Sequence, residues 1–129
     1  MARIRALPML AAFGVAALAL GSTASDAVAF SARFAWCAGS PRFTLKEVPA
    51  GTTALQFTMT DLDAPGFHHG GGTVAYRGEA VIACGAFSAG FTGPAPPPGR
   101  VHTYEFRVKA LGPGGAVLAT ARARRRFPE

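Results

Sequence analysis

The segment HTYEFRVKAL, His102–Leu111, alternates strictly between two kinds of side chain. One set is mostly apolar or aromatic and contains His102, Tyr104, Phe106, Val108 and Ala110. The other set is polar and contains Thr103, Glu105, Arg107 and Lys109. A period of two is typical of a strand with one face in the core and the other in water. The segment therefore predicts a half-buried β-strand in which His102 and Tyr104 point inward.

The same period recurs in FSARFAW (30–36) and TALQFTMT (53–60), and TVAY (73–76) and AVIAC (80–84) are shorter candidate strands. The terminal AVLATARARRRF (116–127) is rich in helix-forming residues, but it directly follows the turn LGPGG, so we expect a strand. The loop GPAPPPG is too rich in proline to join a central ladder. The pattern predicts an all-β fold, a sandwich or small barrel of mostly antiparallel strands with few or no helices.

The N-terminus has the layout of a secretory leader. Two arginines are followed by an uncharged, mostly apolar run over 6–20, and small residues then offer cleavage after Ala24 or Ala29. The run is shorter than the ~20 residues that a membrane-spanning helix needs, so we expect no stable membrane insertion. The sequence predicts a signal peptide at 1–29, with cleavage after Ala29 favoured, and one periplasmic or secreted domain at 30–129.

Two cysteines, Cys37 and Cys84, lie in the predicted mature domain. In an oxidising compartment two cysteines in a small domain are more often paired than free, which predicts a disulfide. A pair of buried thiols is the alternative.

The chain is basic, with a formal net charge of +6, and four arginines crowd its end. These are Arg122, Arg124, Arg125 and Arg126. They have no interleaved aromatic platform and no nucleic-acid-binding motif accompanies them, so we expect a solvated terminal strand and no nucleic-acid partner.

The segment DLDAPGFHHGGG, Asp61–Gly72, holds most of the reactive side chains. Two aspartates and a histidine form a chemically acceptable metal site, but no familiar ligand spacing is present. The glycine run lacks the lysine of a phosphate-binding loop, and no complete G-x-S-x-G motif occurs. We therefore expect a non-enzymatic protein without a cofactor, and keep a metal-assisted hydrolase using Asp61, Asp63 and His69 as an alternative.

The order of motifs resembles the phosphatidylethanolamine-binding protein family, in particular its short bacterial Raf kinase inhibitor-like members. The resemblance spans Phe30 to about Leu111. The matching positions are Ser40, Pro41, Phe43, Val48, Pro49, Gly51 and Thr52, then Asp61, Asp63, Ala64, Pro65 and His69, then Gly93, Pro94, Pro96, Pro97, Gly99, His102 and Tyr104. The sequence departs from the family pattern at Leu62, Gly70, Ala95 and Thr103.

The resemblance implies a β-sandwich with a small pocket for phosphate-like or carboxylate anions. The pocket residues that it implies are Asp61, Asp63, His69, His102 and Tyr104, with Gly93 and Pro94 in the wall. Because carboxylates repel anions, we expect them to accept hydrogen bonds from the histidines or loop amides. The glycines at 70–72 are expected to let backbone N–H groups face the anion. The leading interpretation is an exported small-ligand-binding protein; a protein-interaction or inhibitor module acting on an envelope or secreted partner is the alternative.

Overall fold

The computed structural model describes residue 9, residues 11–21 and residues 28–129. The alternative cleavage point after Ala24 lies outside these residues, as does much of the predicted leader. Residues 11–21 and 28–30 form neither helix nor strand, and the first strand starts at Ser31. Among the described residues, no helix is long and apolar enough to cross a membrane.

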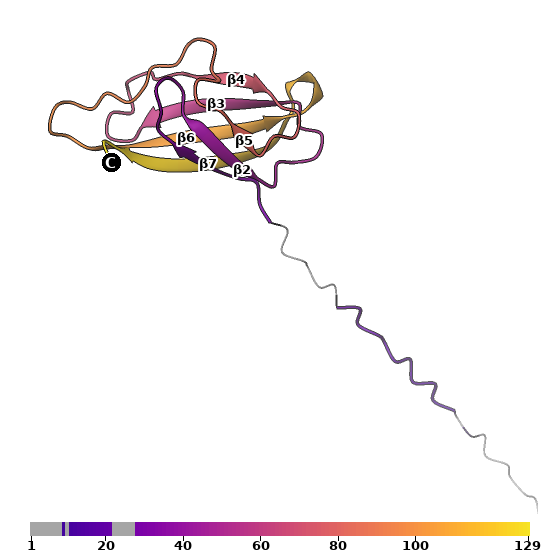
Figure 1. The fold of residues 1–129 in the computed structure, drawn as a ribbon. Coiled ribbons are helices and arrows are strands. Elements are labelled where there is room, and N and C mark those ends of the chain that lie inside the picture. The colour runs from indigo at the N-terminus through magenta and orange to yellow at the C-terminus, as the bar shows by residue number, and fades with distance from the viewer. Residues whose placement is uncertain (1–8, 10, 22–27) are drawn as a thin grey trace, which may run out of the picture.

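Seven strands in the described part of the chain form two antiparallel sheets, which confirms the all-β, sandwich-like prediction (Figure 1). The three-stranded sheet has the order β1 (Ser31–Ala35), β2 (Arg42–Lys46) and β5 (Val81–Ile82). The four-stranded sheet has the order β4 (Gly71–Ala75), β3 (Ala54–Asp61), β6 (His102–Leu111) and β7 (Val117–Phe127). A short 3₁₀ turn, η1 (Pro113–Gly115), lies between β6 and β7.

The alternation of β6 produces the buried face of the larger sheet. Tyr104, Phe106 and Val108 have no exposed surface. Phe43 on the smaller sheet contacts Phe57 and Phe106 on the larger one, with ring centroids 4.4 and 4.9 Å apart. Burying one such side chain contributes roughly 1.5–3 kcal/mol, so this aromatic cluster is a main source of cohesion between the sheets.

The predicted strands differ from the observed ones mainly at the smaller sheet. The terminal segment is strand β7, as expected, but β2 was not among the predicted strands although Phe43 and Leu45 alternate with polar residues. The expected strand 80–84 shortens to Val81–Ile82. The chain leaves the ladder there because Cys84 turns toward Cys37 and the next amide, that of Gly85, donates to the Ser40 carbonyl.

Cys37 and Cys84 form a disulfide, which confirms the predicted pairing. Their Cα atoms are 6.1 Å apart, within the usual range for a disulfide. The bond joins the segment after β1 to the segment after β5 and closes a loop of 47 residues in sequence separation.

Two side-chain hydrogen bonds join β1 and its following segment to β7. The Trp36 indole donates to the Arg126 carbonyl at 2.8 Å, and the Arg125 guanidinium donates to the Phe34 carbonyl at 2.9 Å. The two sheets are therefore connected along this side by polar contacts as well as by the apolar core.

Candidate functional site

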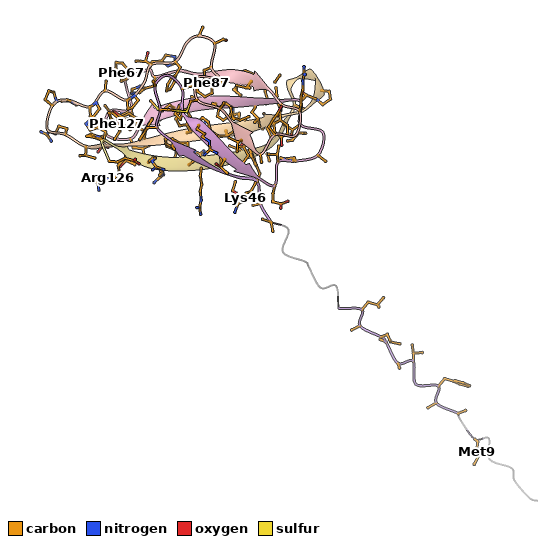
Figure 2. All side chains as sticks on the ribbon, in the orientation of Figure 1. Met9, Lys46, Phe67, Phe87, Arg126 and Phe127 are labelled. Carbon is orange, nitrogen blue, oxygen red and sulfur yellow. A yellow bond between two sulfur atoms is a disulfide. The ribbon has the colours of Figure 1, made fainter. Side chains whose placement is uncertain are left out.

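The reactive side chains gather at one end of the domain, where β3 ends and β6 begins. Antiparallel pairing sets Asp61 opposite Tyr104, and His102 is the first residue of β6. Figure 2 shows Phe67 and Phe127 at this end of the domain, opposite Lys46. The register therefore brings the segment after β3 beside the start of β6.

Asp61 organises this end of the domain through three hydrogen bonds. Its side chain is almost fully buried, with 5 % of its surface exposed, and Oδ2 accepts a hydrogen bond of 2.6 Å from Nδ1 of His102. Oδ1 accepts bonds from the backbone amides of Asp63 and Ala64 at 2.9 and 3.1 Å. The exposed Asp63 accepts a bond of 2.7 Å from the Thr103 amide. Both carboxylates thus accept hydrogen bonds, as expected, and tie the loop to β6.

The pKa of Asp61 reflects a competition between burial and these bonds. Burial alone raises the pKa, but the hydrogen bond from His102, the Asp63 and Ala64 amides and the charge of His102 together lower it below its ordinary value. Asp61 is therefore ionised at neutral pH. Because a carboxylate only accepts, Nδ1 of His102 carries the proton, and Nε2 is left for another partner.

His69, like His102, is held in place by a hydrogen bond from its Nδ1 atom. It is 3 % exposed, and its Nδ1 donates to the Thr92 carbonyl at 2.8 Å. The ring packs against Phe67 and Tyr104, with centroids 4.5 and 5.5 Å away. Among the described residues no hydrogen bond engages Nε2 of His69.

A cavity of about 230 Å³ brings the two imidazoles together. Its lining consists of Asp61, Ala64, Phe67, His69, Ala95, Pro97 and His102. Since Nδ1 of each histidine is already bonded, the nitrogens that remain for a ligand are the two Nε2 atoms. The volume suits a molecule of only a few heavy atoms, because one water molecule occupies about 30 Å³ in the liquid.

Tyr104 lies beneath this cavity rather than on its surface. It has no exposed surface, and its hydroxyl is the one buried side-chain polar atom in the described part of the chain without a hydrogen-bond partner. Burial, and then the negative charge of Asp61, raise its pKa. An unpaired buried hydroxyl lowers the free energy of unfolding. Tyr104 therefore has a free hydrogen-bond donor, and its ring lies next to those of His69 and His102.

The loop residues Gly93 and Pro94 are not in the cavity wall where the resemblance put them. They line a neighbouring cavity of about 260 Å³ with Trp36, Cys37, Gly39, Phe91 and Phe127. Ala95 and Pro97, which follow them in the loop, take the expected place beside the histidines. Sequence reasoning also missed Phe67, whose signal was a lone aromatic residue within a polar turn.

The glycine run has a different role from the one expected. The Gly71 amide donates to the Gly90 carbonyl at 3.2 Å instead of facing a ligand. A Cβ on Gly70 or Gly71 would lie 1.9 or 1.8 Å from the carbonyl oxygen of Gly90 or Phe57. These glycines are therefore required for close backbone packing of β4.

A metal site is the other arrangement that these residues permit. Ligand atoms of Asp61, Asp63 and His102 all lie within 4.8 Å of one another, so His102, not His69, accompanies the aspartates. In this geometry the carboxylates of this cluster are already hydrogen-bonded within the protein, Asp61 to His102 and Asp63 to the Thr103 amide.

Comparison of the chain with protein-family models and with curated proteins found no match.

Proposed function

We propose that this protein is an exported small-ligand-binding protein, similar in its motifs to the phosphatidylethanolamine-binding family. Its ligand is a small carboxylate or phosphate-like anion held between His69 and His102. The proposal makes Asp61 a positioning residue and assigns no catalytic step to the protein.

The supporting observation is the orientation of the two histidines around one cavity. Each ring is anchored through Nδ1, one on Asp61 and the other on the Thr92 carbonyl, which leaves the two Nε2 atoms for the ligand. A protonated imidazole donates a charge-assisted hydrogen bond, which is roughly twice as strong as a neutral one. The buried Tyr104 hydroxyl is a further donor close to the same cavity.

The disulfide supports export. Disulfides persist in secreted and periplasmic proteins and are rare where thiols are kept reduced. A signal peptide at 1–29 accounts for delivery to such a compartment, and the apolar run over 6–20 is its central part.

The test uses three single substitutions, because the chain has three histidines. Inorganic phosphate and acetate are titrated into the protein while amide chemical shifts are followed. His69→Gln and His102→Gln retain a hydrogen-bond donor but lose the ability to become positively charged. We expect each to weaken binding by about tenfold or more, because the ligand loses a charge-assisted donor.

His68→Gln is the matched control, because His68 is exposed and does not line the cavity. The affinity of this variant for phosphate and acetate should equal that of the wild type. Shifts confined to 120–126, with the cavity residues silent, contradict the proposal. Retention of a divalent metal through dialysis supports the hydrolase alternative instead.

A protein-interaction role is the second candidate, and exposed apolar residues near the cavity favour it. Leu62, Phe67 and Val101 are exposed and adjoin the segments that carry Asp61, His69 and His102. A partner retained equally by wild type and by His102→Gln, but lost with Phe67→Ser, supports this role.

A further inference from the structure

A second charged feature lies on the outer face of β6 and β7, away from the buried core. Five cationic side chains point outward there, and we call them the basic face. They are Arg107, Lys109, Arg122, Arg124 and Arg126. The register pairs Arg107 with Arg122, Glu105 with Arg124, and Thr103 with Arg126, so the five form one continuous surface over two strands.

The fold does not neutralise this surface. Glu105 is the only acidic residue among the outward positions of the two strands, and it binds both Arg122 and Arg124, at 2.9 and 2.8 Å. Five cations against one carboxylate leave an excess of four positive charges. Arg107, which is directly opposite Arg122, forms no ion pair in the described part of the chain. Like charges in opposite positions destabilise a sheet, so this arrangement is costly without an external anion.

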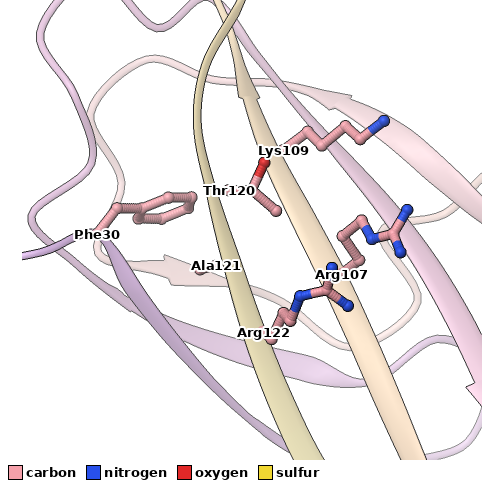
Figure 3. Close-up of a pocket in the computed structure, with 6 residues that line it drawn as sticks. All are labelled: Phe30, Arg107, Lys109, Thr120, Ala121 and Arg122. Atoms are coloured by element: carbon pink, nitrogen blue, oxygen red, sulfur yellow. The ribbon is translucent and has the colours of Figure 1, made fainter.

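The basic face also contains a hollow of about 530 Å³. Arg107, Lys109 and Arg122 border it with the Thr120 hydroxyl, and Figure 3 shows Phe30 on the other side of β7. The long cationic side chains and the hydroxyl are the groups that bind phosphate oxygens.

The side chains of the basic face favour one class of anionic partner over another. Its outward positions over 103–109 of β6 and 120–126 of β7 are threonine, glutamate, lysine and arginine, with no aromatic side chain. Single-stranded nucleic acid is bound by stacking bases on aromatic rings, which this surface lacks. An array of cations without stacking groups instead suits a partner that presents many phosphates in a plane, as a bilayer of anionic lipid does.

Phe30 places the entry of the chain into the domain beside the basic face. It borders the hollow and directly precedes β1.

We propose that the basic face docks the domain onto the surface of an anionic lipid bilayer through lipid phosphates. The contact is electrostatic and peripheral. It is independent of the cavity, because none of the five cations lines the cavity that contains His69 and His102.

The experiment is co-sedimentation with phosphatidylcholine vesicles that contain or lack phosphatidylglycerol. Residues 30–129 are used, because every described strand and both cysteines lie within them. Arg107→Gln/Lys109→Gln removes two charges of the basic face. Arg33→Gln/Arg42→Gln, the matched control, removes two exposed charges from the smaller sheet. Thermal unfolding of both variants checks that each is folded.

We expect the wild type to bind only the anionic vesicles, and about 0.5 M salt to release it. The Arg107→Gln/Lys109→Gln variant should lower the partition coefficient roughly 30-fold, and the Arg33→Gln/Arg42→Gln control by less than about twofold. An equal loss of vesicle binding in the two double variants overturns the proposal, and so does equal binding of the wild type to neutral and anionic vesicles. Binding to soluble polyphosphate or single-stranded DNA without binding to vesicles also overturns it and identifies a soluble polyanion as the partner.

Discussion

Asp61 and Glu105 are two buried carboxylates on neighbouring strands, separated by one register position, yet their surroundings differ. The pKa of each is lowered. For Glu105 the main cause is the hydrogen bond from Arg124, followed by burial, which opposes it, and the bond from Arg122. The side chains of these arginines are 65 % and 55 % exposed, whereas Asp61 is held by the His102 ring, whose side chain is 15 % exposed, and by two backbone amides.

The difference separates two uses of a carboxylate. Asp61 fixes a geometry, since its three partners belong to the loop after β3 and to the start of β6, and it lines the cavity itself. Glu105 balances charge on a solvated surface, where long side chains rearrange and salt weakens their attraction. The following predictions test this distinction and the end of the domain to which Asp61 belongs, from the largest expected effect to the smallest.

Replacing both cysteines, Cys37→Ser/Cys84→Ser, tests how much the disulfide stabilises the domain. The loss of the closed loop should lower the free energy of unfolding by about 4 kcal/mol in the chain-entropy model. Urea denaturation of the variant and the wild type measures the difference. Thiol titration of the native protein should find no free thiol, and two reactive thiols in denatured, unreduced protein contradict the pairing.

Asp61→Asn and Glu105→Gln compare the two carboxylates directly. Asp61→Asn should lower the free energy of unfolding by about 2–3 kcal/mol, because it leaves buried donors with a weaker acceptor. Glu105→Gln should cost about 1 kcal/mol or less, because its partners are exposed. Equal losses in urea denaturation show that the distinction between the two sites is wrong.

Acid unfolding gives the second comparison. Folding lowers both pKa values from the ordinary 3.8 of Asp61 and 4.5 of Glu105, so the unfolded chain takes up protons first. Each group's contribution is complete above its ordinary pKa and is lost as the pH falls through the lower folded value. Stability should therefore begin to fall below about pH 4.5, and high salt should diminish the contribution of Glu105 more than that of Asp61. Denaturation midpoints of the two variants across this range measure both effects.

Tyr104→Phe should have the smallest effect on stability. Removal of an unpaired buried hydroxyl should leave the free energy of unfolding unchanged or raise it by up to about 1 kcal/mol. If the hydroxyl serves the ligand, the same variant binds phosphate or acetate a few-fold more weakly. A clear loss of stability means that the hydroxyl has a partner in the free protein.

Much of the fold was predictable because burial on one face imposes a period of two. The segment 102–111 was predicted with its boundaries, and β7 was recognised from the preceding turn despite its helix-forming composition. The short strands were less predictable: β5 keeps only two residues because the disulfide and the Ser40 carbonyl draw the chain away. Such tertiary competition leaves no periodic signal in the sequence.

The site was predictable as a set of residues but not as a geometry. The alternation of β6 indicated that His102 and Tyr104 point inward, yet not that the Tyr104 hydroxyl would be wholly buried. The loop motif suggested Gly93 and Pro94, whereas Ala95 and Pro97 reach the histidines. Which side of an irregular loop faces a cavity depends on its path in space, and composition carries no information about that path.

The bonds from Trp36 and Arg125 to the other sheet also bear on aggregation. β7 is the last strand of its sheet, and an exposed edge of eleven residues is a template for pairing with another copy of the chain. Trp36 and Phe34 cover part of this edge, since they engage the Arg126 carbonyl and the Arg125 side chain. The charged side chains of β7 oppose the close approach of a second copy as well. The contact that joins the two sheets therefore protects the molecule from edge-to-edge self-association.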